Sequence, residues 1–208
     1  KDQTYFLYRL PVKALQKILF PLGELHKSQV RELAGKHGLI TAKKPESMGI
    51  CFVGRVGIKE FLRQYFDFRP GDIVDQNGTL VGRHDGAVFY TIGQRHGLDV
   101  GGGLPYYVSG KNMITNEVRV TTDIQDQKLW SDKLTLADSH WLPLPPQNPE
   151  GLSLRVRHQG ELVSVKKLQK LAGGAWRAHL DWAVRALAPG QSAVIYQGNR
   201  CLGGGIVV

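Results

Sequence analysis

The chain has 208 residues, of which 42% are hydrophobic and 22% are charged, a composition typical of globular proteins. Its 27 Lys and Arg residues exceed its 18 Asp and Glu residues by nine, which suits a polyanionic partner such as nucleic acid. Two distant cysteines do not suit a disulfide framework, and neither a signal peptide nor an apolar run of about 18 residues occurs. The sequence therefore predicts a soluble, cytoplasmic protein without a membrane partner. Because it begins at Lys1, we expect it to be a piece of a longer protein.

The first third of the chain predicts short helices around a loop. Pro11 can start a helix that continues to Leu19, and a second amphipathic pattern over residues 30–34 ends at Gly38. Residues 41–47 have no periodicity and contain Pro and Ser, which is typical of a surface loop. Apolar residues at helical spacing over 58–66 predict a third helix that faces the core.

Cys51 directly follows this loop, and its sequence setting supports two interpretations. A lone cysteine before apolar residues is most often buried packing. Lys43, Lys44 and Arg55 would, however, lower the thiol pKa and favour the thiolate if they fold close to the sulfur. Delivery by a loop favours a functional thiol. Cys201, in a glycine-rich strand-like run, is expected to be a buried structural residue.

The middle of the chain predicts two β-hairpins, at 72–74 with 79–81 and at 106–108 with 118–120. Between them, the glycine-rich stretch from His84 to Gly103 could bring the backbone close to a phosphate or could form a set of tight turns. Both interpretations remain open. His84 and His96 lack paired ligand spacing, so we predict no metal site.

The last third of the chain predicts a small antiparallel barrel. The proline-rich stretch 142–149 is an extended connector, close to which we expect a structural boundary, and short alternating apolar runs with glycine-rich turns follow it from Leu152. Arg155, Arg157 and His158 could form a phosphate-facing strip, although alternating charges on a solvated sheet face are at least as common.

Seven segments, in order, resemble the tRNA-specific 2-thiouridylase family: Lys1–Leu7, Phe20–Gly23, Thr41–Lys44, Gly49–Phe52, Thr91–Arg95, Pro189–Ala193 and Cys201–Gly205. The resemblance covers essentially the whole chain. It implies an α+β fold with three parts: the helical end of a PP-loop ATPase domain at 1–60, a small β-rich central domain at 61–135 and a C-terminal antiparallel β-barrel at 136–208.

The family's Ser-Gly-Gly-x-Asp-Ser phosphate loop does not occur in this sequence. The resemblance therefore implies that ATP is bound by an N-terminal half outside this chain, together with a second catalytic cysteine. We expect the chain alone neither to hydrolyse ATP nor to thiolate tRNA.

In the family's chemistry, ATP adenylates the C2 oxygen of the wobble uridine in tRNA, and a persulfide sulfur then replaces that oxygen. The resemblance assigns the persulfide to Cys51, which a sulfur-relay protein would load. It assigns tRNA binding to six residues, of which His158 differs from the side chain of many relatives: Lys1, Asp2, Gln3, Arg157, His158 and Gln191. For Lys43 and Lys44, contact with tRNA, stabilisation of the thiolate and simple solubility all remain open.

Two alternative functions remain. The chain could act alone as a tRNA-binding module, or it could be a free-standing sulfur carrier that uses Cys51 without ATP chemistry. A longer reading frame upstream would argue against the first, and persulfide formation without ATP or tRNA would favour the second.

Overall fold

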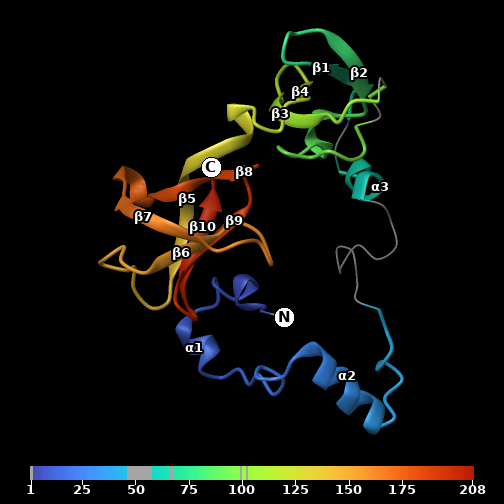
Figure 1. The fold of residues 1–208 in the computed structure, drawn as a ribbon. Coiled ribbons are helices and arrows are strands. Elements are labelled where there is room, and N and C mark those ends of the chain that lie inside the picture. Colours follow the sequence, from blue (N-terminus) through green and yellow to red (C-terminus); the bar gives the residue numbers. More distant parts are fainter. Residues whose placement is uncertain (1, 46–57, 66–67, 99, 102) are drawn as a thin grey trace. The chain divides into compact units, whose positions relative to one another are not determined.

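The computed structural model describes residues 2–45, 58–65, 68–98, 100–101 and 103–208 (Figure 1). These residues divide into two compact units. One comprises Lys1–Gln3 with Leu10–Phe66, and the other comprises Thr4–Arg9 with Asp67–Val208. Within the described ranges, no helix is both long enough and apolar enough to cross a membrane.

The first unit carries three short helices, α1 (Val12–Leu15), α2 (Lys27–Lys36) and α3 (Ile58–Arg63). The predicted helix from Pro11 to Leu19 forms only one α-helical turn, and the chain continues in tight turns in which Lys17 N donates to Ala14 O. That prediction was too long because no residue of α1 is buried. A short helix without a packed face is marginal in water.

Both termini of helix α2 are capped, and its C-terminus ends at the glycine that the sequence predicts. Its first turn is capped by the Gln29 side chain, whose Oε1 accepts a hydrogen bond from His26 N at 2.7 Å. At the other end Gly38 adopts a φ of 64°, and Leu39 N donates to Ala34 O at 2.9 Å. This is the left-handed glycine terminator expected at that position.

The central part of the second unit is a four-stranded sheet of β1 (Gly71–Val74), β2 (Leu80–His84), β3 (Tyr107–Asn112) and β4 (Glu117–Thr121). The strand order is β2-β1-β4-β3, in which β1 runs parallel to β4 and the other two pairings are antiparallel. Both predicted hairpins are therefore confirmed. The core of the sheet is made of fully buried side chains, including Ile73, Val108, Val118 and Val120.

His84, at the end of β2, is buried and gives this sheet a dependence on pH. Its Nδ1 accepts a hydrogen bond from Gly86 N at 2.9 Å, so the ring must stay neutral to keep that bond. Burial lowers the pKa of His84 below its ordinary value near 6.5. The unfolded chain therefore takes up the proton first as the pH falls.

We expect the sheet to lose stability as the pH decreases through about 6.5, the ordinary histidine pKa. Urea unfolding at a series of pH values, followed for the wild type and for His84→Gln, measures this effect. The variant should start less stable and should show a shallower dependence on pH. Parallel curves for the two proteins would contradict a role for His84.

Six strands form the closed barrel: β5 (Trp130–Trp141), β6 (Leu152–Arg155), β7 (Val163–Lys170), β8 (Trp176–Arg185), β9 (Ser192–Gln197) and β10 (Arg200–Val207). They close in the order β10-β5-β8-β7-β6-β9, and every pairing is antiparallel. The predicted antiparallel barrel is confirmed. The proline-rich stretch 142–149 links β5 to β6 and thus lies within the barrel.

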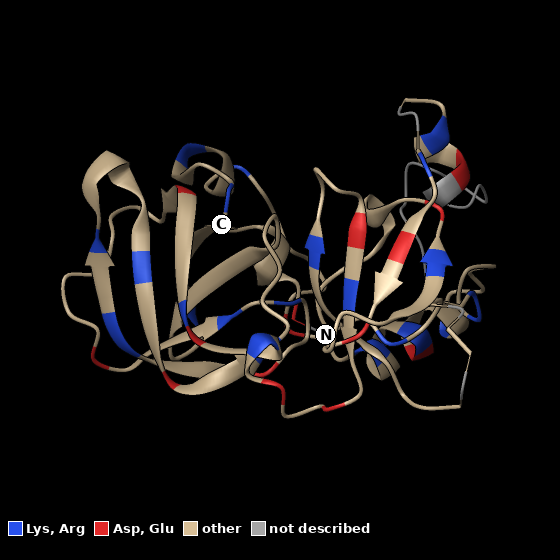
Figure 2. Cartoon of the chain, turned by 90° about the horizontal axis from the view of Figure 1, so that it is seen from above, with Lys and Arg blue, Asp and Glu red and all other residues tan. Residues whose placement is uncertain are grey.

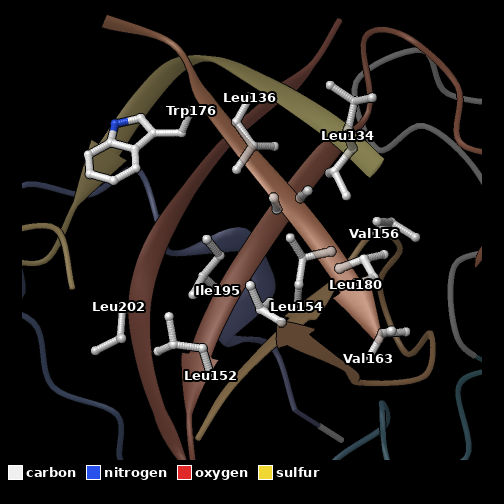
Figure 3. Close-up of a cluster of buried hydrophobic side chains, with 14 residues drawn as sticks. Leu134, Leu136, Leu152, Leu154, Val156, Val163, Trp176, Leu180, Ile195 and Leu202 are labelled. Carbon is white, nitrogen blue, oxygen red and sulfur yellow. The ribbon is translucent and has the colours of Figure 1, made fainter. Parts of the chain in front are cut away.

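Alternate residues of β5, β6, β8 and β9 fill the barrel interior together with residues of β7 and β10, and the leucine, isoleucine and valine side chains converge there (Figure 3). Strand β10 closes the barrel between β9 and β5. Its residues Gly203, Gly204 and Gly205 lie where the backbone of β10 comes close to atoms of β5 and β9. A Cβ atom at Gly204 would overlap the carbonyl oxygen of Ala193 on β9. Glycine is required there because the neighbouring backbone occupies the space.

Short 3₁₀ turns occur at Thr4–Phe6, Ala87–Phe89, Gln127–Leu129 and Ala172–Gly174. The first of these belongs to a segment that positions the candidate site.

Candidate nucleic-acid interface

Residues Thr4–Arg9, here called the strap, pack on the outside of the barrel. Ala193 and Ile195 of β9 point into the barrel core, so Val194 and Tyr196 between and after them point outward. Both outward residues are nevertheless almost fully buried, because they form one cluster with Tyr5 and Tyr8 of the strap.

Hydrogen bonds fix the strap in register. The Tyr5 hydroxyl donates to Ser192 O at 2.8 Å and lies 3.4 Å from Val156 O. The Tyr8 hydroxyl and Ser192 Oγ are 3.1 Å apart. Burial raises the pKa of the Tyr5 phenol, which keeps the proton that these bonds need. The strap therefore joins the end of β6 to the start of β9.

An ion pair secures the far end of the strap. Arg9 Nη2 donates to Asp138 Oδ2 on β5 at 2.6 Å, and both side chains are partly exposed. An exposed pair of this kind contributes less than about 1 kcal/mol. The buried tyrosines therefore contribute most of the free energy that holds the strap on the barrel. The ion pair fixes the position of the end of the strap at Arg9.

Arg157 and His158 follow β6 and lie beside the strap. The His158 ring packs against the exposed Phe6 ring, with 4.6 Å between centroids, and lies 6.1 Å from Tyr5. The exposed Arg157 uses one guanidinium nitrogen, Nη2, to donate to Ala186 O at 2.9 Å. This bond holds the guanidinium at the surface, where its other donors can reach an anion.

Gln191 lies immediately before β9, next to Ser192, whose carbonyl oxygen accepts from Tyr5. Its Oε1 atom and the Nδ1 atom of His158 are both buried, and neither has a hydrogen-bond partner among the residues that the structure describes. Buried polar atoms without partners are costly. Each of these two atoms therefore needs a partner that the described residues do not provide.

The structure thus brings Arg157, His158 and Gln191 together around Tyr5 of the strap. Asp2 and Gln3 are exposed and directly precede the strap in the chain, and Lys43 and Lys44 are exposed as well. The predictions for Lys1 and Cys51 lie outside the described residues.

Sequence reasoning missed the strap residues Tyr5, Phe6 and Tyr8. A signal was present, because Tyr5 in the 3₁₀ turn and Tyr8 just after it are three positions apart, a spacing that can place both on one side. Nothing in the sequence showed, however, which distant surface they would cover.

Cys201 lies on β10, as expected, and packs against the cluster of strap tyrosines. The expected full burial is wrong, because the residue is only half-buried. The strap covers the neighbouring β9 more completely than it covers the start of β10, where the chain leaves the turn.

Gly93 in the Thr91–Arg95 motif forms a turn, with a φ of 78°. Its N–H donates to Val108 O at 2.7 Å, so it is not available to a phosphate. A Cβ atom here would overlap the side chain of Ala186, the residue whose carbonyl accepts from Arg157. The tight-turn interpretation therefore holds at Gly93, which supports the loop that positions Arg157. No group of three or more metal-ligating side chains occurs among the described residues.

Comparisons with known proteins divide the chain into three matches. Residues 1–55 match the model described as tRNA methyl transferase HUP domain, and residues 59–122 match the tRNA methyl transferase PRC-barrel domain. Residues 131–207 match the aminomethyltransferase beta-barrel domain. The tRNA-specific 2-thiouridylase MnmA of Bacillus subtilis strain 168 is 42% identical over 209 residues, covering 100% of this chain and 56% of that protein.

In sequence, the chain matches the C-terminal portion of the tRNA-specific 2-thiouridylases. The enzymes of Staphylococcus aureus strains RF122 / ET3-1 and JH9 are also 42% identical, over 218 residues, with the same coverage. The chain thus spans about half the length of the curated 2-thiouridylases it matches. The strap falls within the HUP-domain match, yet it packs on the barrel that the third model matches.

Proposed function

We propose that this chain supplies the tRNA-binding surface and the sulfur carrier of an enzyme that 2-thiolates the wobble uridine of tRNA. The observation that carries the proposal is the strap site, which gathers Arg157, His158 and Gln191 around Tyr5 in a chain similar to 2-thiouridylases throughout. The net charge of +9 supports a polyanionic substrate.

The site residues divide by their chemistry. Arg157 contacts a phosphate, because its guanidinium is charged and exposed. Gln191 and His158 are polar side chains that can hydrogen-bond to sugar or base groups. Lys1, Asp2 and Gln3, which precede the strap in sequence, contact tRNA as well in this proposal.

Cys51 carries the sulfur in this proposal. The terminal sulfur of its persulfide attacks C2 of the uridine, and the oxygen leaves with AMP. The thiolate of a second cysteine then attacks Sγ of Cys51, which forms a disulfide and leaves the sulfur on C2. A thiol reductant reopens the disulfide, and a sulfur-relay protein reloads Cys51.

ATP would supply the adenylyl group that makes the uridine oxygen a good leaving group. We assign none of the residues of this chain to ATP, since its sequence has no family phosphate loop. The residues responsible would belong to a part of the enzyme outside this chain.

We expect Arg157→Ala to lower the slope of log affinity against log salt for tRNA binding by nearly one unit, the loss of one phosphate contact. If the chain neutralises about 3 to 5 phosphates, each contributes a slope of about 0.7 to 0.9 in a plot of log affinity against log salt. Gln191→Ala should weaken binding with little change in slope, because an amide releases no counterion. A salt titration with a tRNA transcript measures both.

Arg157→Lys is the matched control, since it keeps the charge but not the planar donor set. It should retain the wild-type slope. Absence of tRNA binding at low salt would overturn the proposal. An unchanged affinity and slope for Arg157→Ala would remove the strap site from it.

A further inference from the structure

The outer face of the barrel carries a second group of cations, on β5, β8 and β7. The strand register places Lys133 of β5 and Lys167 of β7 on either side of His179 of β8. Two residues before His179 on β8, Arg177 lies between Thr135 of β5 and Gln169 of β7. We call Lys133, Lys167, Arg177 and His179 the basic face.

These side chains point away from the core. Their neighbours along the strands, Leu134, Leu168 and Ala178, pack in the barrel interior, and side chains alternate between the two sides of a strand. Lys133, Lys167 and Arg177 are exposed. Lys and Arg segments accordingly recur on neighbouring barrel strands in Figure 2.

The basic face has no internal charge compensation. Within the described ranges of the chain, none of its three Lys and Arg side chains forms an ion pair with a carboxylate. Asp181, two residues after His179 on β8, is exposed and does not pair with them. Lys166, exposed at the β7 bulge, adds another positive charge. Like charges on neighbouring strands reduce stability, so a bound anion would offset their repulsion.

This face is separate from the strap site. In the barrel order β10-β5-β8-β7-β6-β9, the strap covers β9, contacts the end of β6 and pairs Arg9 with Asp138 of β5. The basic face is centred on β8 and uses β5 at Lys133, five residues before Asp138. Strands lie about 4.8 Å apart, so Lys133 and Lys167 are about 10 Å apart across β8. Long, flexible side chains at this spacing can contact successive phosphates of one nucleic-acid strand.

We propose that the basic face is a second phosphate-backbone contact for RNA, independent of the strap site and without base recognition. The inference rests on the proposed function, because it takes tRNA as the polyanion. It assigns Lys133, Lys167 and Arg177 one phosphate each. Because these contacts are purely electrostatic, they should position the RNA and determine much of the salt dependence.

The test is a salt titration of tRNA-transcript binding to the triple variant Lys133→Gln, Lys167→Gln and Arg177→Gln. The slope should fall by about 2 to 2.7 units, the contribution of three phosphate contacts. The matched control removes three cations that already have carboxylate partners: Lys36→Gln, Arg83→Gln and Arg119→Gln, paired with Glu32 at 2.8 Å, Asp72 at 3.3 Å and Glu117 at 2.9 Å. Both triple variants change the net charge equally.

A large fall in slope for the first variant and a small one for the control would support the basic face. Equal falls would show a dependence on net charge alone and would overturn it, as would an unchanged slope. If the triple variant does not fold, Arg177→Gln alone should lower the slope by about 0.7 to 0.9. A lower slope for the basic-face variant, together with no effect of Arg157→Ala, would support this inference and would remove the strap site from the proposed tRNA-binding surface. If the wild type did not bind tRNA, both this inference and the proposed function would be overturned.

Discussion

Replacing Gly204 with alanine should destabilise the barrel by more than about 3 kcal/mol, at or beyond the upper end of typical overpacking effects. The new Cβ would overlap the carbonyl oxygen of Ala193 and would lie 3.0 Å from the Cα atom of Val194. Both are backbone atoms, which cannot rotate away as a side chain can. Moving β10 would disturb its pairing with β9 and with β5, the pairings that close the barrel.

Thermal unfolding followed by circular dichroism measures this effect, and the midpoint should fall by more than about 10 °C. Gly35→Ala is the control, because nothing lies within 4 Å of a Cβ atom there and alanine favours helix α2. It should leave the melting of the barrel unchanged. A midpoint for Gly204→Ala within about 2 °C of the wild type would show that β10 can shift without loss.

Cys51→Ser in the complete enzyme should reduce tRNA thiolation on the order of 10³-fold or more, the scale expected for loss of a covalent catalyst. A serine hydroxyl cannot hold a sulfane sulfur, so no persulfide forms. Binding of tRNA should stay within a factor of about two, since the strap site and the basic face are unchanged. Mass spectrometry of 2-thiouridine after a single turnover gives the measurement.

Cys201→Ser is the matched control and should keep thiolation activity. Cys201 is half-buried against the strap tyrosines, so alkylation of the native protein should label Cys51 first. Preferential labelling of Cys201, or thiolation by the Cys51→Ser enzyme, would refute the assignment of the carrier.

Local patterns were enough to predict the hairpins and the barrel. Asn77 and Gly78 predict a tight turn, in which only Gly78 adopts a positive φ, of 82°. Asp75 stabilises the turn by accepting from Asn77 N and Thr79 N. Alternation along β6 is equally local, since every second residue faces the core, and the continuous apolar run of β9 predicts a strand buried on both sides. These features depend on neighbours in sequence.

The strap and the closeness of Arg157 to Gln191 could not be predicted in the same way. Tyr5 bonds to Ser192, which is 187 positions away, and no periodicity encodes that pairing. The resemblance suggested the residues of the tRNA surface, but the aromatic ring that joins them appears only in three dimensions. The helix expected over residues 11–19 was too long because propensity was read without knowing whether a packing surface exists.

The attachment of the strap to the barrel also restricts the conformational freedom of the segment that follows it. Residues 4–9 and 67–208 form one unit, so the chain from Leu10 to Phe66 leaves that unit and returns to it. Docking of Tyr5 and Tyr8 therefore closes a loop whose entropy cost is met on folding and not on substrate binding. A thiol at position 51 is tethered at both ends to the body that we propose holds the tRNA. In the reaction that we propose, the encounter of Cys51 with the bound uridine is therefore intramolecular and depends on an effective concentration that the protein concentration does not alter.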